Sequence, residues 1–161
     1  MAAHLNLNDT RQALSKTHQE LLSTLSGAND ETLHRRAAEG TWSLAEVLAH
    51  VSDARRFFIR EAVRVISSPG SRMGRTIQDP GRISAVKEHG TDSASALRDA
   101  LNGSHAEVMS ALDKMSDADL EIPGEHVKFG RQTVGELIQH FIVEHEQKHV
   151  QQARRCAGSL S

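Results

Sequence analysis

The sequence predicts an all-α fold, a four-helix bundle with long connections. Four segments repeat apolar residues at the 3.6-residue period of a helix, and aromatic residues make up only 3% of the chain. A β-sandwich or barrel would need more aromatic and β-branched residues. The 161 residues, of which 38% are hydrophobic, are enough for one domain with its own core. We therefore expect a single helical domain that spans residues 1–161.

The first two helices are expected at residues 7–25 and 43–67. Leucines at helical spacing form the apolar stripe of the first, which is Leu7, Leu14, Leu21, Leu22 and Leu25. The stripe of the second is Leu44, Val47, Leu48, Val51, Phe58, Val65 and Ile66. Ser43 and Glu46 have the spacing of a capping box, and Trp42 and Val47 have that of a hydrophobic staple. Both devices predict that the second helix begins at residue 43.

The other two helices are expected at residues 94–115 and 133–157. The stripe of the third helix is Leu97, Leu101, Val108, Leu112 and Met115. That of the fourth is Val134, Leu137, Ile138, Phe141 and Ile142. Thr133 and Glu136 have the spacing of a second capping box, which predicts the start of the fourth helix.

Long connections join the four helices. Residues 26–42 are expected to contain a short helical turn near 31–38. Residues 68–93 are rich in Gly, Pro, Ser and Arg and are expected to form a loop, and residues 116–132 contain a predicted turn at Pro123 and Gly124. Connections of this length are often functional, and they allow neighbouring helices to run parallel.

The charge and the cysteine content exclude several classes of function. The net charge is −2, whereas a general binder of the phosphate backbone is usually strongly basic. Asp53 and Glu61 interrupt the basic face expected on the second helix, which is Arg55, Arg56, Arg60 and Arg64. Nucleic acid is therefore an unlikely partner. One cysteine allows neither an internal disulfide nor a Cys-rich zinc site. Without an apolar run of membrane length or a secretory signal, we expect a soluble, cytoplasmic protein.

The histidines give the most specific functional signal. His145 and His149 lie four residues apart on one face of the fourth helix and continue its apolar stripe, so both imidazoles can reach one point. Such a pair is a common start to a divalent metal site, and His50 on the second helix is the best candidate for a third ligand. Three imidazoles would leave a coordination position open for water or substrate. The alternative is that these are buried, hydrogen-bonded histidines without a metal.

The other histidines, two glutamates and the cysteine are not expected to be ligands. His140 lies about 140° around the helix from His145, which indicates a surface position or one that supports the site. His18 and His105 fall on apolar stripes and are expected in the core. Glu144 and Glu146 point away from the face of His145, and Cys156 is expected to pack as a small apolar residue. Surface positions are expected for His4, His34, His89 and His126.

Two stretches of sequence resemble a known family, the DinB/YfiT-like superfamily. They are WSLAEVLAH at residues 42–50 and GRQTVGELIQHFIVEHEQKHVQQ at residues 130–152. The resemblance implies a four-helix bundle that binds a metal through His50, His145 and His149. It also implies a homodimer. Characterised members include transferases and isomerases that use low-molecular-weight thiols such as bacillithiol or mycothiol, which a metal would activate as thiolates.

Two functions are therefore weighed. The first is a metal-dependent enzyme, a thiol-dependent S-transferase or a hydrolase, that acts on a small molecule. Its metal is zinc, nickel, manganese or iron, all of which accept imidazole ligands. Arg72, Arg75 and Arg82 in the long connection would hold an anionic substrate or the carboxylates of a thiol, unless they are simply solvated. The second function is a non-enzymatic helical dimer or a stress-related binding module.

Overall fold

Four long helices form the body of the molecule, as predicted. The structure is a computed structural model that describes residues 6–158. The helices are α1 (Leu7–Leu25), α3 (Leu44–Ser67), α5 (Ala94–Asp113) and a fourth made of α6 (Val134–Ile138), a π-helical segment (Gln139–Glu144) and α7 (His145–Gly158). No helix among the described residues has the length and apolar character that a membrane span requires.

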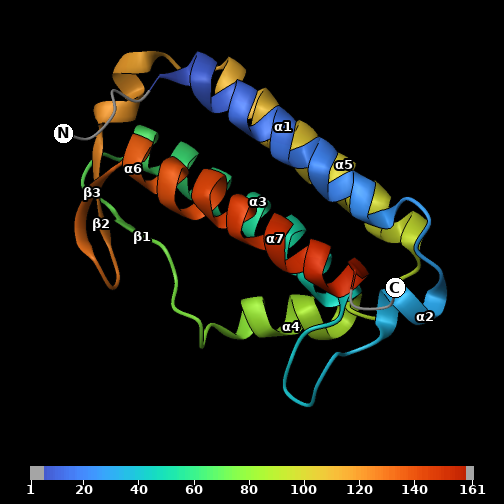
Figure 1. Cartoon of the computed structure of the whole chain (residues 1–161). Coiled ribbons are helices and arrows are strands. Elements are labelled where there is room, and N and C mark those ends of the chain that lie inside the picture. The colour runs from blue at the N-terminus through green and yellow to red at the C-terminus, as the bar shows by residue number, and fades with distance from the viewer. Residues whose placement is uncertain (1–5, 159–161) are drawn as a thin grey trace.

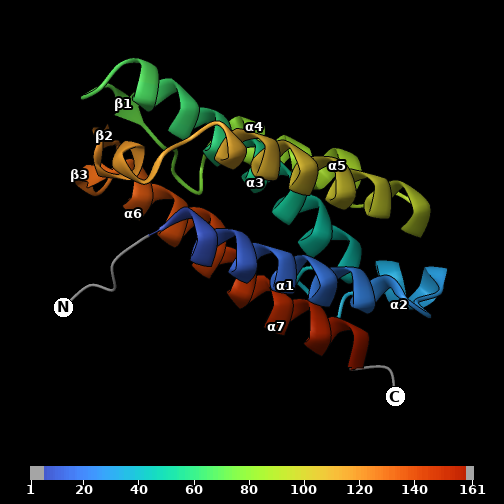
Figure 2. The same cartoon turned by 90° about the horizontal axis from the view of Figure 1, so that it is seen from above.

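The helices pack as a four-helix bundle in which α1 contacts α5 and α7, and α3 contacts α5 and α7 (Figure 1). The chain colours show that neighbouring α3 and α5 run in the same direction, and so do α1 and α7 (Figure 2). This order differs from a simple up-down-up-down bundle, in which every neighbour is antiparallel. The long connections make it possible, because a parallel neighbour can be reached only by crossing the length of the bundle.

Polar residues divide the hydrophobic core into two clusters. One cluster contains Leu14, Ile59 and Leu112, and the other contains Leu21, Leu48 and Leu101. Between them each long helix contributes buried polar side chains, a set that we call the polar layer: Thr17, His18, Arg55, Ser104 and Glu146. The helices therefore bury apolar surface at both ends of the bundle and polar groups in the middle.

The connections contain more regular structure than predicted. Residues 68–93 hold β1 (Arg72–Met73) and α4 (Pro80–His89), so the expectation of a loop was wrong. The short helix α2 (Asp30–His34) ends earlier than expected. Residues 116–132 hold a 3₁₀ helix (Asp117–Glu121) and the hairpin of β2 (Pro123–His126) and β3 (Gly130–Thr133). The predicted turn at Pro123 and Gly124 was wrong too, because both residues belong to β2.

The three strands form a small sheet at one end of the bundle, in the order β1-β2-β3 (Figure 1). β1 and β2 are parallel, and β2 and β3 are antiparallel. The sheet leads directly into α6, because Thr133 is both the last residue of β3 and the N-cap of α6. Its hydroxyl accepts a hydrogen bond from the backbone N–H of Glu136, but the Glu136 carboxylate accepts from that hydroxyl and not from the backbone, so this predicted capping box is only half formed. The box of Ser43 and Glu46 is complete.

His126 is buried in this sheet, with 3% of its surface exposed, so the predicted surface position was wrong. Its ring stacks on Phe141, with 4.9 Å between the ring centroids. Its Nδ1 accepts hydrogen bonds from the backbone N–H groups of Lys128 and Phe129, because the hairpin turn wraps around the ring. Burial lowers the pKa of His126, and the charge of Lys128 lowers it further.

Gly74 contacts the other side of the His126 ring, and its replacement by alanine is expected to destabilise the protein by about 2 kcal/mol. A Cβ at this position would lie 2.3 Å from Nε2 of His126, and the backbone φ of +86° disfavours any side chain. Gly70 is the matched control, because its φ is +83° but a Cβ added there would have no neighbour within 4 Å. Urea unfolding of Gly74→Ala and Gly70→Ala separates the cost of the positive φ, which both variants have, from the cost of the clash with His126, which only Gly74→Ala has. Equal losses in the two variants would mean that the contact with His126 contributes nothing.

Candidate metal centre

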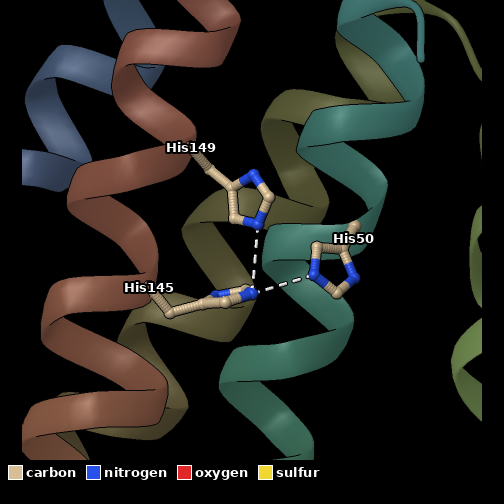
Figure 3. A group of neighbouring side chains, drawn as sticks. All are labelled: His50, His145 and His149. Carbon is tan, nitrogen blue, oxygen red and sulfur yellow. Dashed lines mark hydrogen bonds between the residues drawn. The ribbon is translucent and has the colours of Figure 1, made fainter. Parts of the chain in front are cut away.

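Three imidazoles from two helices meet at one point (Figure 3). His50 lies in the second turn of α3, and His145 and His149 lie in the first two turns of α7. Nε2 of His145 is 2.9 Å from Nε2 of His50 and 3.1 Å from Nε2 of His149. The three residues that the spacing singled out are therefore brought together, across 95 positions of sequence between His50 and His145.

Gln152 determines which nitrogen of His149 carries the proton. The side-chain oxygen of Gln152 lies 2.7 Å from Nδ1 of His149 and is an acceptor, so Nδ1 donates to it. Nε2 of His149 then presents a lone pair to the centre. Gln152 belongs to the second of the two stretches that carry the family resemblance.

The three nitrogens have too few protons to hydrogen-bond to one another. If Nε2–H of His145 donates to His149, it has no lone pair left for His50, and it cannot donate twice. One of the two close nitrogen contacts is therefore left without a hydrogen between the atoms. In addition, Nδ1 of His50 and Nδ1 of His145 are buried without a hydrogen-bond partner among residues 6–158. A close approach of two Nε2 atoms without a hydrogen between them is expected where both lone pairs point at one cation.

Burial keeps these imidazoles neutral. It is the main reason that the pKa of His50 falls to about 2 and that of His145 to about 3, and the neighbouring imidazoles, Arg82 and Arg75 lower both further. The pKa of His149 is lowered for the same first reason, although its hydrogen bond to Gln152 opposes the shift. At neutral pH all three side chains are deprotonated, which is the state that binds a metal.

The geometry and the donor set fit a divalent transition ion. Two imidazole nitrogens that lie about 2.1 Å from one ion are roughly 3.0–3.4 Å apart at octahedral and tetrahedral angles. Two of the nitrogen separations, 2.9 and 3.1 Å, lie just below and within this range, and all three ligand atoms lie within 4.8 Å of one another. Among the described residues no other group of three or more His, Cys, Asp or Glu side chains is close enough to hold an ion. The group consists of three imidazoles, the number of protein ligands that open catalytic sites have.

Trp42 forms a wall of the centre, which the sequence did not indicate beyond a role in helix capping. Its ring centroid is 5.0 Å from that of His50 and 6.3 Å from that of His149. Trp42 directly precedes the N-cap Ser43, so the capping box that starts α3 also places this ring beside the second turn. The chain has only this one tryptophan.

The remaining residues lie outside the centre, most of them as predicted. His140 is half exposed and bonds to Glu144 on the same face. His18 is buried, and its ring stacks on that of the half-buried His105 at 4.0 Å. The thiol of Cys156 donates to the carbonyl of Trp42 at 3.6 Å, and burial raises its pKa. His89 is exposed, His34 is half-buried with both ring nitrogens near backbone carbonyls, and His4 lies outside the described residues.

Arg55 was expected on an exposed face, and this expectation was wrong. Its side chain is 1% exposed and forms a salt bridge with Glu146, which is 2% exposed. The guanidinium also donates to the carbonyl of Leu101 at 3.0 Å and to the hydroxyl of Ser104 at 3.2 Å. Thr17 donates to the other oxygen of the Glu146 carboxylate at 3.0 Å. The polar layer thus joins all four helices next to His145.

The π-helical segment explains why Glu146 is buried. A π turn closes its hydrogen bonds one residue farther along than an α turn and accommodates about one extra residue, so that later side chains are rotated by roughly 100°. Beyond this segment the buried face consists of Glu146, Val150 and Ala153. His145 and His149 lie beside that face, at its border with α3.

The arginines of the long connection have different environments. Arg72 is exposed on β1. The side chain of Arg75 is only 7% exposed. It pairs with Asp53 at 2.5 Å and lies 4.2 Å from the centroid of the Phe57 ring. Arg82, in the first turn of α4, lies over Trp42 with its guanidinium carbon 5.6 Å from the ring centroid. Of these three arginines, only Arg82 lies over a wall of the metal centre, and its guanidinium forms no salt bridge.

Comparison with known proteins identifies both a family model and similar folds. The model described as the DinB superfamily matches residues 13–153. YfiT from Bacillus subtilis, described as a probable metal-dependent hydrolase with an unusual four-helix bundle topology, is 16% identical, with a TM-score of 0.80 over 96% of this chain and 87% of that one. No curated protein sequence matched.

Two further solved structures share the fold. A mycothiol-dependent maleylpyruvate isomerase is 15% identical, with a TM-score of 0.73 over 95% of this chain and 62% of that one. The colibactin self-resistance protein ClbS, in complex with double-stranded DNA, is 10% identical, with a TM-score of 0.70 over 96% of both chains. At these identities the similarity shows the fold alone.

Proposed function

This chain belongs to the DinB superfamily, and we propose that it is a metal-dependent enzyme that acts on a small molecule at the centre formed by His50, His145 and His149. The observation that carries the proposal is the convergence of three neutral imidazole nitrogens that have too few protons to hydrogen-bond to one another. Three protein ligands leave a position for water or substrate, which distinguishes a catalytic site from a closed structural one.

The reaction that we propose is thiol transfer or hydrolysis. A divalent ion bound here would lower the pKa of a thiol or water in the open position and supply a nucleophile at neutral pH. The chain's own part is to keep the ligands neutral by burial and to orient His149 through Gln152. The description of YfiT as a probable metal-dependent hydrolase supports hydrolysis, and the mycothiol-dependent isomerase is an example of this fold in a thiol-dependent enzyme.

The arginines on α3 favour a small-molecule substrate over nucleic acid. Arg55 is buried, Arg60 pairs with Glu107 at 2.8 Å, and Arg64 pairs with Glu61 at 2.8 Å. The basic face of this helix is thus largely neutralised, whereas binding to a phosphate backbone depends on unpaired cations. ClbS shows that this fold occurs in a complex with DNA, so a test of DNA binding by this chain belongs beside the metal experiment.

Metal uptake tests the proposal directly. Protein purified without a histidine tag is expected to bind about one equivalent of Zn²⁺, Ni²⁺, Mn²⁺ or Fe²⁺ after loading and dialysis, because three preformed neutral imidazoles need no rearrangement. His145→Ala is expected to lower the affinity at least about 100-fold, since it removes the ligand that joins the other two. Elemental analysis gives the stoichiometry. The fluorescence of Trp42, which lies 5.0 Å from His50, reports the affinity.

His140→Ala is the matched control, because His140 lies on the same helical stretch but is exposed and bonded to Glu144. It should bind metal as the parent does. Less than about a tenth of an equivalent of every metal in the parent protein would contradict the proposal and favour a non-enzymatic helical module. A His145→Ala variant with unchanged metal content would mean that the ligands are wrongly assigned.

A further inference from the structure

Arg82 lies one aromatic ring away from the metal centre. It belongs to the first turn of α4, and its guanidinium carbon is 5.6 Å from the centroid of the Trp42 ring. The same ring lies 5.0 Å from the ring of His50. Nη1 of Arg82 donates to the backbone carbonyl of Ile77 at 3.2 Å, which helps to hold the side chain in place. The guanidinium thus lies over the ring of Trp42, which contacts the centre, and is half-buried.

The guanidinium of Arg82 has no salt bridge. Within residues 6–158 no carboxylate lies within 4.0 Å of the guanidinium nitrogens, and Asp53, whose charge acts on Arg82 from farther away, is bonded to Arg75. Burial and the charge of Arg75 lower the pKa of the Arg82 guanidinium, and the charge of Asp53 opposes them.

A half-buried arginine without a salt bridge is available to pair with an anion. The planar guanidinium presents parallel N–H donors whose spacing matches a carboxylate, and the face of Trp42 offers an apolar surface beside it. One unpaired arginine balances one negative charge, which favours a carboxylate over a phosphate dianion. Arg75 is not a second candidate, because Asp53 and Asp79 already surround its guanidinium.

We propose that Arg82 binds a carboxylate of the small molecule on which the three-histidine centre acts, so that the substrate is an organic acid held between Arg82 and the open position of the centre. This inference rests on the proposed function. It assigns Arg82 as a residue that determines specificity, since its guanidinium lies over Trp42 beside the centre and is not one of the three ligands.

Calorimetric titration of zinc-loaded protein with two matched thiols tests the inference. The probes are 3-mercaptopropionate and 3-mercaptopropionamide, which have the same shape and differ in the charge of the terminal group. The parent is expected to bind the carboxylate about tenfold more tightly than the amide. In Arg82→Met the two affinities are expected to become nearly equal, whereas zinc stoichiometry and the affinity for the amide stay as in the parent.

Arg72→Met is the control, because Arg72 is an exposed arginine of the same connection. It should keep the preference of the parent. If Arg82→Met binds zinc and still prefers the carboxylate tenfold, the role of Arg82 is overturned while the metal-dependent function stands. If the parent itself takes up no zinc, both are overturned. The stoichiometry therefore separates the two failures.

Discussion

Glu146→Ala is expected to lower the free energy of unfolding by about 3–5 kcal/mol, the cost of leaving a buried charge without its partner. The variant removes the carboxylate that pairs with Arg55, a side chain that is 1% exposed. It also removes the acceptor of the Thr17 hydroxyl. The hydrogen bonds of Arg55 to Leu101 and Ser104 remain, but they do not neutralise the guanidinium. Urea unfolding of metal-free protein at neutral pH measures the loss.

Two further variants separate the ion pair from simple loss of volume. The double variant Arg55→Met and Glu146→Leu replaces the pair with apolar side chains of similar size, and we expect it to lie within about 1 kcal/mol of the parent or above it. Glu107→Ala breaks an exposed pair with Arg60 and should cost less than about 1 kcal/mol. If Glu146→Ala lowered the free energy of unfolding by less than about 1 kcal/mol, water would have to reach Arg55 in the variant.

The stability of the metal-free protein is expected to fall by about 4 kcal/mol between pH 7 and pH 5 because of two histidines. The pKa is about 2 for His50 and about 3 for His145 in the folded protein, against about 6.5 when unfolded. Between these values the unfolded chain binds a proton at each residue that the folded chain does not bind. The contribution of these two histidines to the free energy of unfolding is therefore present above pH 6.5. It decreases as the pH falls, by at most about 1.4 kcal/mol per pH unit for each histidine.

The double variant His50→Asn and His145→Asn isolates this contribution. His18, His105 and His126 also have lowered pKa values and add to the total, so the quantity of interest is the difference between parent and variant. Unfolding free energies from urea titrations at pH 7 and pH 5 give that difference. A variant with the same pH dependence as the parent would show that these two imidazoles are protonated in the folded state.

The long helices were predictable because each one buries a continuous stripe. Periodicity gave α1 its observed bounds and placed α3 and α5 within a residue or two. The short elements were not predictable in the same way. β1 has two residues and pairs with β2 about fifty positions away, and α4 buries only Val86. Neither element carries a local pattern strong enough to stand out from a loop.

The same contrast holds for the candidate site. The three histidines were predictable, because two share a helical face and the third lies on a stripe that must face it. Arg55 also lies on the stripe of Val51 and Phe58, so periodicity alone indicated its burial. The charge of Arg55 predicted an exposed position instead. Its burial is explained only by the salt bridge to Glu146, which lies on a helix distant in sequence. Arg82 and Trp42 meet through tertiary packing, which no local spacing encodes.

The π-helical segment at Gln139–Glu144 makes the site depend on a count of residues as well as on their identities. His145 and His149 stay four residues apart on one helical face whatever precedes them. Their angle around the helix relative to His50, however, depends on the extra residue in the π-helical segment. A homologous chain that lacks this residue can therefore retain both histidines and direct them elsewhere. To sort relatives into metal-binding and non-binding members, one must therefore count the residues between the capping threonine and the first histidine of the pair.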